Sequence, residues 1–305
     1  MDTMSLFTRA PSNPIIRPGD VPAPCMAVCN PGAHLEGDDV VLLLRVIDPD
    51  NHSHIWVARS RDGVSDWRYN PAPLLGPSVS TAWYETEGAE DARVVWSPER
   101  GEYVVAYVGV SRFGAGVCLA TTRDFSEVTP LGLVIHPYNK DAALFPRQIG
   151  GRYSLLHRPT AGPLENIWVA DSDNLTEWGN PRCVLEESDQ PGWYSGKVGA
   201  GPPPIETEHG WLLIFHGVQL EETGWLYRVG LALLDREDPS RILAKTPQWV
   251  FGPETAYEQQ PPKPGIVFPC GAVIREGVLS LYYGAADSTV CLATAPLQSL
   301  LDALA

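Results

Sequence analysis

A three-part pattern recurs five times along this chain of 305 residues, and it constrains the fold more than any other feature. Each copy has a short first strand that begins with a small or polar residue, an apolar or alternating second strand after a turn, and a third strand. The third strands are the most alike, since Ile55-Trp-Val-Ala-Arg-Ser-Arg-Asp returns as Val117-Cys-Leu-Ala-Thr-Thr-Arg-Asp. Equivalent strands are roughly 50 to 70 residues apart, a period typical of propeller blades rather than of a helical solenoid.

The pattern therefore predicts an all-β protein, a five-bladed β-propeller. The β-branched and aromatic content of the repeated segments, and the turn residues between them, agree with strands. The only helix that we expect lies at Leu297 to Leu304. The second strands of the five copies are predicted at Asp39 to Val46, Glu102 to Gly109, Arg152 to Pro159, Trp211 to Val218 and Val278 to Ala285.

Five blades of about 55 to 60 residues use nearly all of the chain, so residues 1–305 are predicted to form a single catalytic domain. The net charge of −15 argues against binding to nucleic acid or to an anionic membrane surface. No run is apolar and long enough to span a bilayer, and Met1 to Pro14 lacks the pattern of a secretory signal. We expect a cytoplasmic protein. An oligomeric state is not readable, and a homo-oligomer stays open.

The six cysteines are too sparse for a disulfide scaffold in a chain of this length. Cys118 and Cys291 occupy the same place in two third strands, where a small buried residue is expected. Metal binding by Cys25 and Cys29 lacks a second Cys/His pair at ligand spacing. The sequence therefore predicts neither a metal nor an organic cofactor.

Equivalent positions of successive repeats form a ring around a propeller axis, and several of these positions are polar. The first strands contribute Asn30, Asp91 and Asp141, with Lys140 beside the last; the second strands end in Arg45, His157 with Arg158, His216 and Asp287; Lys197 precedes the fourth first strand. Surface solvation explains any one of them alone. As a set they are better explained by a charged ligand, because burying so many charges is costly.

The cationic members of this ring suit an oxyanion or a phosphate, which guanidinium groups bind bidentately. Asp91 and Asp287 could then serve a proton or a sugar hydroxyl. Three aromatic residues outside the repeats, Trp193, Tyr194 and Trp225, are candidates for lining a carbohydrate pocket, although packing is the alternative. The sequence has no G-x-S-x-G elbow, no H-E-x-x-H helix and no phosphate-binding glycine loop before a helix.

Six segments of the chain form a combination that matches one known family: Gly88 to Arg93, Asn139 to Pro146, His157 to Pro159, Lys197 to Ile205, Phe215 to Val218 and Tyr282 to Asp287. From about Asn13 to Thr294 the chain resembles glycoside hydrolase family 130. The family consists of five-bladed propellers, mostly inverting phosphorylases of β-mannosides, with a minority of β-1,2-mannosidases.

The resemblance implies a role for each member of the ring. Asp91 resembles the general acid, while Asn30, Arg45, Lys140 and Asp287 resemble ligands of the mannosyl unit. We add Asp141 and Glu90 to the substrate-binding set. Glu87 and Glu90 are near Asp91 and are candidates for a base, but the favoured role of Glu90 is to orient its neighbours or bind a hydroxyl. A basic group of residues resembles the family's phosphate site: Lys140, His157 and Arg158, and less directly Lys197 and His216.

Chemistry favours the phosphorylase. An inverting glycosidase needs an acid and a base that activates water, whereas a phosphorylase needs only the acid because phosphate is already an anionic nucleophile. The predicted enzyme is thus a hexosyltransferase that cleaves β-mannosides, with β-1,2-linked manno-oligosaccharides as the favoured substrates and inorganic phosphate as co-substrate, to give α-mannose 1-phosphate. One alternative is an inverting β-1,2-mannosidase on the same scaffold. The other is a non-catalytic propeller that binds a glycan or a protein.

Overall fold

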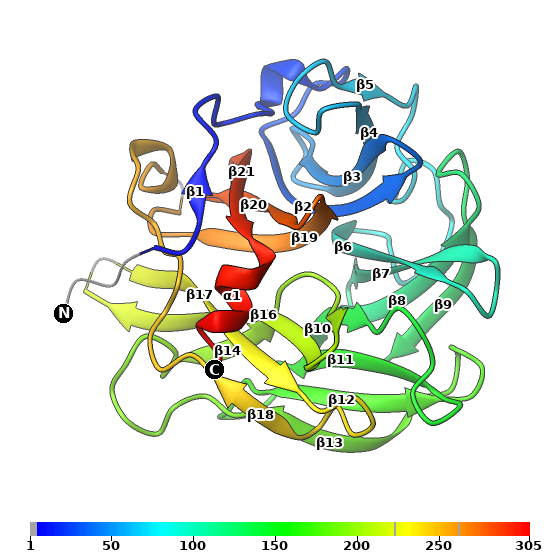
Figure 1. Ribbon diagram of the computed structural model, residues 1–305. Helices are drawn as coiled ribbons and strands as arrows, with labels where there is room; N and C mark the ends of the chain where they lie inside the picture. Colours follow the sequence, from blue (N-terminus) through cyan, green and yellow to red (C-terminus); the bar gives the residue numbers. More distant parts are fainter. Residues whose placement is uncertain (1–4, 223, 262) are drawn as a thin grey trace.

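The computed structural model describes residues 5–222, 224–261 and 263–305, and these are almost entirely β-strand and turn (Figure 1). Their one α-helix is α1 (Leu297–Asp302), which lies within the stretch expected to be helical. Two single 3-10 turns occur at Pro18–Asp20 and Ala256–Glu258. The all-β prediction is therefore confirmed. Among the described residues, no helix is both long and apolar enough to cross a membrane.

The strands form five antiparallel groups, one for each copy of the sequence pattern, and Figure 1 shows these groups arranged side by side around a common centre. The first two groups are joined into one eight-stranded sheet by a single parallel pair, Ser53 with Gly88. The N-terminal strand pairs with the last strand of the chain, so the fifth group contains both ends of the sequence.

The bounds of the strands follow the groups. The first group is β2 (Ala27–Glu36), β3 (Asp39–Ile47), β4 (Ser53–Ser60) and β5 (Arg68–Tyr69); the second is β6 (Gly88–Ser97), β7 (Glu102–Ser111), β8 (Gly114–Thr122) and β9 (Thr129–Ile135); the third is β10 (Asn139–Leu144), β11 (Tyr153–Pro159), β12 (Ile167–Ser172) and β13 (Gly179–Leu185). The fourth is β14 (Lys197–Ala200), β15 (Ile205–Thr207), β16 (Gly210–Glu221), β17 (Gly224–Leu234) and β18 (Ile242–Lys245); the fifth is β19 (Val267–Arg275), β20 (Val278–Ala285), β21 (Thr289–Pro296) and β1 (Thr8–Arg9).

The second strand of each copy of the sequence pattern is largely buried between neighbours, as its apolar sequence predicts. These strands are β3, β7, β11, β16 and β20. In β3, for example, the run from Val40 to Leu44 is almost wholly inaccessible to solvent. The first strands approach one another closely near the centre. A Cβ atom added at Gly32 of β2 would lie 2.4 Å from the carbonyl oxygen of Ala92 in β6, so only glycine fits there.

A β-bulge recurs at the same place in three first strands. The register shifts between Cys29 and Gly32 in β2, between Glu90 and Arg93 in β6, and between Lys140 and Ala143 in β10. Each bulge contains one residue in the left-handed region, with φ of 48° at Asn30, 49° at Asp91 and 52° at Asp141. Asn and Asp tolerate this conformation better than most residues, and bulges re-aim side chains. In these three strands the polar residue predicted to open the strand lies inside it, in the bulge, where Asn and Asp suit the backbone.

Candidate active site

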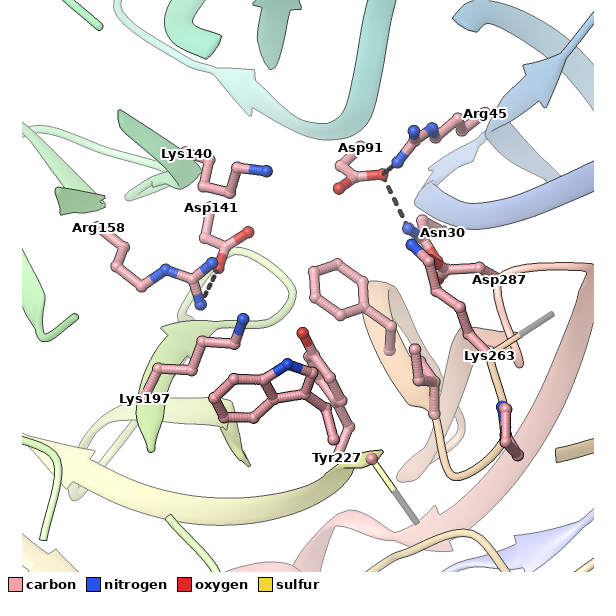
Figure 2. A pocket seen from close by; sticks show the side chains of 15 residues that line it. Asn30, Arg45, Asp91, Lys140, Asp141, Arg158, Lys197, Tyr227, Lys263 and Asp287 are labelled. Atoms are coloured by element: carbon pink, nitrogen blue, oxygen red, sulfur yellow. Dashed lines mark hydrogen bonds and ion pairs between the residues drawn. The ribbon is translucent and has the colours of Figure 1, made fainter. Parts of the chain in front are cut away.

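A cavity of about 460 Å³ lies where the five groups meet, and every group contributes to its wall (Figure 2). Its polar lining combines five cations with three carboxylates and one amide. The residues are Arg45, Lys140, Arg158, Lys197 and Lys263, then Asp91, Asp141 and Asp287, then Asn30. Trp225, Tyr227, Ile266 and Phe268 supply most of its apolar wall. Eight of the ten residues in the predicted polar ring thus line one cavity.

Asp91 is held by two neighbours through one of its carboxylate oxygens. Asn30 donates a hydrogen bond to Oδ1 over 2.8 Å, and Nη1 of Arg45 lies 3.2 Å from the same atom. Burial alone would raise the pKa of Asp91, but Arg45, Arg93 and the Asn30 hydrogen bond outweigh it and lower the pKa. In Figure 2 the second oxygen is free of these contacts, among the residues drawn, and remains available to a ligand.

Arg45 is oriented by a hydrogen-bond network that also includes Glu90. Its Nη2 lies 2.7 Å from Oε1 of Glu90, and its Nε donates to the hydroxyl of Ser53 over 3.0 Å. Burial opposes the charged guanidinium, but Asp91 and Glu90 raise the pKa of Arg45 above its usual value. Glu90 is not part of the cavity wall. It holds the guanidinium of Arg45 in place through their ion pair.

Asp141 forms the centre of a buried ionic cluster on the opposite side of the cavity. Its Oδ2 atom lies 2.8 Å from Nη1 of Arg158 and 3.3 Å from Nε2 of His216, and its Oδ1 atom lies 3.6 Å from Nη2 of Arg93. Burial would raise the pKa of Asp141, but Arg158, His216 and Arg93 hold it well below its usual range. The carboxylate therefore stays charged and fixes the Arg158 guanidinium.

Arg93 is a buried structural residue that the sequence interpretation did not single out. Its side chain is 1% exposed and donates to the carbonyl oxygens of Asp91, Ala200 and Gly201. It thereby ties β6 to β14 directly beneath the cavity. An arginine two residues after Asp91 carries no repeat signal, so only the three-dimensional structure identifies this role.

The remaining cations differ in how strongly they are held. The Nζ atom of Lys197 lies 4.9 Å from the ring centre of Trp225 and 5.5 Å from that of Tyr227. Burial, followed by repulsion from Arg158, lowers the pKa of Lys197. Figure 2 shows the side chains of Lys140, Arg158 and Lys197 converging on one side of the cavity. Together they form a cationic wall facing Asp91.

Lys263 lies on the other side and pairs with Asp287 across 2.7 Å (Figure 2). Burial opposes its charge, but Asp287 raises the pKa of Lys263. Lys263 follows the 3-10 turn in a connection outside the repeats, and for that reason sequence reasoning missed it. Tyr227 and Phe268 were missed as cavity residues too. Tyr227 stands directly opposite Val218 in the β16–β17 ladder, a register that was readable only after pairing was known.

Two histidines predicted to bind phosphate do not line the cavity. His216 is fully buried beneath Asp141 and Arg158, and its pKa is lowered to about 4 by burial. His157 is buried beside Asn139, whose Oδ1 atom lies 3.1 Å from Nδ1, and burial lowers its pKa to about 4 as well. Both rings are therefore neutral at neutral pH. Neither ring adds charge to the cationic wall; His216 contacts it, since its Nε2 atom lies 3.2 Å from Nη1 of Arg158.

Of the three aromatic residues proposed for a carbohydrate pocket, only Trp225 lines the cavity. Trp193 is 6% exposed and packs against Phe215 at a ring separation of 5.5 Å. Tyr194 packs edge-on against Trp193, and its hydroxyl accepts a hydrogen bond from Lys245. The packing alternative is therefore correct for these two residues, which fill space beside β16 left open by Gly217. In the described part of the chain no three His, Cys, Asp or Glu side chains group as a metal site would require.

Comparison with known proteins assigns the chain to a family. Residues 8–305 match the model of glycoside hydrolase family 130 that is described as beta-1,4-mannooligosaccharide phosphorylase. The chain belongs to glycoside hydrolase family 130. A β-1,2-mannobiose phosphorylase from Listeria innocua is 39% identical over 241 residues, an alignment that spans 78% of this chain and 65% of that protein. The alignment thus covers slightly less than two thirds of this relative's length.

Other members of family 130 align over more of their length. A 1,2-β-oligomannan phosphorylase from Thermoanaerobacter is 33% identical over 284 residues, which span 90% of this chain and 91% of the relative. The solved structure of the Listeria innocua β-1,2-mannobiose phosphorylase with β-1,2-mannobiose superposes with a TM-score of 0.88 at 31% identity. It covers 100% of this chain and 99% of the other.

Proposed function

We propose that this family 130 protein is an inverting β-mannoside phosphorylase that cleaves β-1,2-linked manno-oligosaccharides with inorganic phosphate. The observation that carries the proposal is the cationic wall of Lys140, Arg158 and Lys197, which faces a single well-held carboxyl group, Asp91, across the cavity. Ammonium and guanidinium groups in a partly desolvated site are suited to a phosphate dianion. The relatives named as phosphorylases of β-1,2-linked mannosides support the choice of linkage.

In the proposed reaction a phosphate oxygen attacks the anomeric carbon of the terminal mannosyl group from the face opposite the glycosidic bond. The bond between that carbon and the leaving oxygen breaks, and its electron pair stays on the oxygen. Asp91 supplies the proton that the leaving oxygen takes up, either directly or through a sugar hydroxyl. The products are α-mannose 1-phosphate and the shortened saccharide. Positioning of the two reactants accounts for much of the rate in such a reaction.

The charges around Asp91 suggest that phosphate prepares the acid. In the free site the lowered pKa of Asp91 keeps its carboxyl group ionised at neutral pH. A bound dianion neutralises nearby cations, Lys140 among them, and repels the carboxylate. Both effects raise the pKa of Asp91 and favour the protonated form that an acid needs.

Among the described residues that line the cavity, no carboxylate besides Asp91 is free to serve as the base that the alternative hydrolase needs. The other two carboxylates of the cavity wall are engaged: Asp141 is paired with Arg158, and Asp287 with Lys263. Glu90 is paired with Arg45 outside the wall. An inverting hydrolase needs a second carboxylate that is free to activate water. These pairings favour phosphate over water as the nucleophile.

We further propose that the five strand groups are the blades of a five-bladed propeller and that residues 1–305 are one domain. Two observations support this: one cavity collects residues from all five groups, and β1 pairs with β21. Such pairing of the two chain ends is a way to close a ring of blades. The six cysteines are free, which suits a reducing compartment and the cytoplasmic location expected from the sequence.

The test is a comparison of product release with and without phosphate. β-1,2-Mannobiose and β-1,4-mannobiose are each incubated with the enzyme, and mannose 1-phosphate and free mannose are quantified separately. We expect α-mannose 1-phosphate from the β-1,2 substrate, only when phosphate is present. Free mannose released at full rate in phosphate-free buffer would instead establish the mannosidase. If neither product forms under any condition, the enzyme readings fail and the non-catalytic binding protein is the remaining alternative.

A further inference from the structure

Three exposed aromatic residues gather at the edge of the molecule next to the active site, and we name them the rim aromatic cluster. They are Trp83, Phe113 and Tyr138, and more than half of each residue is exposed, at 55%, 51% and 55%. Exposed aromatic groups of this size are uncommon on a surface without a binding function. None of the three lines the cavity.

The cluster is a built surface rather than three unrelated side chains. The rings of Trp83 and Phe113 meet edge to face, with centres 5.7 Å apart. The guanidinium of Arg112 covers one face of Phe113 at 4.6 Å. The Tyr138 ring rests directly on the backbone of the same turn, since a Cβ atom added at Gly114 would lie 2.3 Å from it. Contacts of this kind hold the aromatic faces in place before any ligand arrives.

The cluster lies on the same face of the molecule as the cavity opening. Phe113 is in the turn between β7 and β8, and the corresponding turn of the fifth group, between β20 and β21, contains the cavity residue Asp287. Tyr138 precedes the cavity residue Lys140 by two positions. Val108 pairs with Glu90, the neighbour of Asp91, and Phe113 follows Val108 by five positions along β7 and its turn. At the rise of a β-strand this path along β7 is about 17 Å, the length of a few sugar rings.

We propose that the rim aromatic cluster is a distal subsite that binds the sugar rings of a longer manno-oligosaccharide beyond the bond that is cleaved. The inference rests on the proposed function, because the terminal mannosyl group must occupy the cavity for the rest of the chain to extend over the rim. The C–H groups of a pyranose ring form an apolar face, and aromatic rings bind such faces without needing charge. The three members of the cluster are themselves uncharged aromatic groups, which suits a neutral saccharide.

The subsite makes a prediction about chain length. With saturating phosphate, kcat/KM is measured for β-1,2-mannobiose and β-1,2-mannotetraose with the wild-type enzyme and with Trp83→Ala. We expect the variant to lose roughly three- to tenfold in kcat/KM on the tetraose, through KM, with little change on the biose. Trp83→Phe should recover most of the loss because it keeps an aromatic face.

Trp96→Ala is the matched control. Trp96 is an exposed tryptophan near the other end of β6 and packs edge-on against Tyr103. Its replacement should leave the tetraose-to-biose ratio unchanged. An equal loss on both substrates with Trp83→Ala, or no loss on either, overturns the subsite. So does a change of oligomeric state in sedimentation without a change in that ratio, because the cluster would then be an interface between copies of this chain.

Calorimetric binding of mannotetraose separates this proposal from the proposed function, since it requires no turnover. Binding that weakens in Trp83→Ala but not in Trp96→Ala supports the subsite even if the wild-type protein releases no mannose 1-phosphate, and in that case only the proposed phosphorolysis fails. Normal phosphorolysis combined with tetraose binding that is the same in both variants overturns the subsite alone.

Discussion

At the scale of single residues, Asp91 is the group whose replacement should separate chemistry from binding. Asp91→Asn keeps an oxygen that can accept from Asn30 and Arg45, and it keeps the left-handed backbone of the bulge. It removes the transferable proton. We expect turnover to fall roughly 10²- to 10⁴-fold, the usual range for general acid catalysis. Saccharide affinity, measured by calorimetry, should change little; near-full turnover on an unactivated mannoside would refute the assignment.

The cationic wall calls for a second residue test, and the geometry decides which cation to remove. Arg158 is the nearest partner of the buried Asp141, so Arg158→Ala also leaves that charge with only His216 and Arg93 beside it and should lower stability. Lys197 forms no ion pair with a buried carboxylate among the described residues. Its ammonium lies over the rings of Trp225 and Tyr227 instead. It is therefore the cleaner probe.

We expect Lys197→Met to raise KM for phosphate about 10- to 150-fold, the effect of losing a charge-assisted contact worth about 1.5 to 3 kcal/mol. The KM for the saccharide should move less. Lys245→Met is the matched control, since Lys245 also lies over an aromatic ring, that of Tyr194, but outside the cavity. An unchanged phosphate KM in Lys197→Met would remove Lys197 from the phosphate site.

Much of this site was predictable because the repeat places equivalent residues at one axis. Asn30, Asp91 and Asp141 could be aligned by sequence, and the structure brings them to one cavity. What the repeat does not encode was not found: Lys263 lies in a connection, and Arg93 has no counterpart in the other copies. The histidines show a further limit. His216 was predicted to end a strand but lies inside β16, and only packing shows that it sits against Asp141 and Arg158 without lining the cavity.

At the scale of elements, the close approach of strands at the centre makes a sharp prediction for β14. A Cβ atom at Gly199 would lie 2.3 Å from Oδ2 of Asp141 and 2.4 Å from the His216 ring. Gly199→Ala should therefore push apart the buried cluster that holds Arg158. We expect a lower melting temperature and a higher KM for phosphate.

Gly179→Ala provides the comparison. Gly179 is also a strand glycine, in β13, and nothing lies within 4 Å of a Cβ atom added there. Thermal unfolding and phosphate kinetics of the two variants are measured side by side. A Gly199→Ala protein that behaves like Gly179→Ala would mean that the cluster has room to relax, contrary to the tight packing described for it.

At the scale of the whole molecule, the charge distribution is uneven in a way that composition alone does not reveal. The chain carries a net charge of −15, yet cations outnumber carboxylates in the wall of its central cavity. The fold gathers cations that are scattered in sequence, from Arg45 to Lys263, at the junction of the five groups. The sequence predicted that gathering for every cation except Lys263, whereas the ion pairs that fix each charge depend on side-chain geometry.

Buried histidines should also make the stability of the whole molecule depend on pH. Burial lowers the pKa of His157 and of His216 to about 4, whereas in an unfolded chain a histidine titrates near 6.5. Between these two values the unfolded state binds more protons, so the free energy of unfolding falls as the pH drops from 6.5 towards 4 and is unaffected above this window. At pH 5.5 the loss is about 1 kcal/mol for each histidine. Asp141, with its lowered pKa, acts at more acidic pH, where its stabilising charge is lost only as the pH falls below the ordinary value of 3.8.

Urea unfolding of wild type, His157→Gln and the exposed-site control His209→Gln at pH 7.5 and 5.5 measures the effect. We expect a smaller pH difference in His157→Gln alone; equal differences in all three proteins would show that His157 takes up its proton as readily in the folded state as in the unfolded chain.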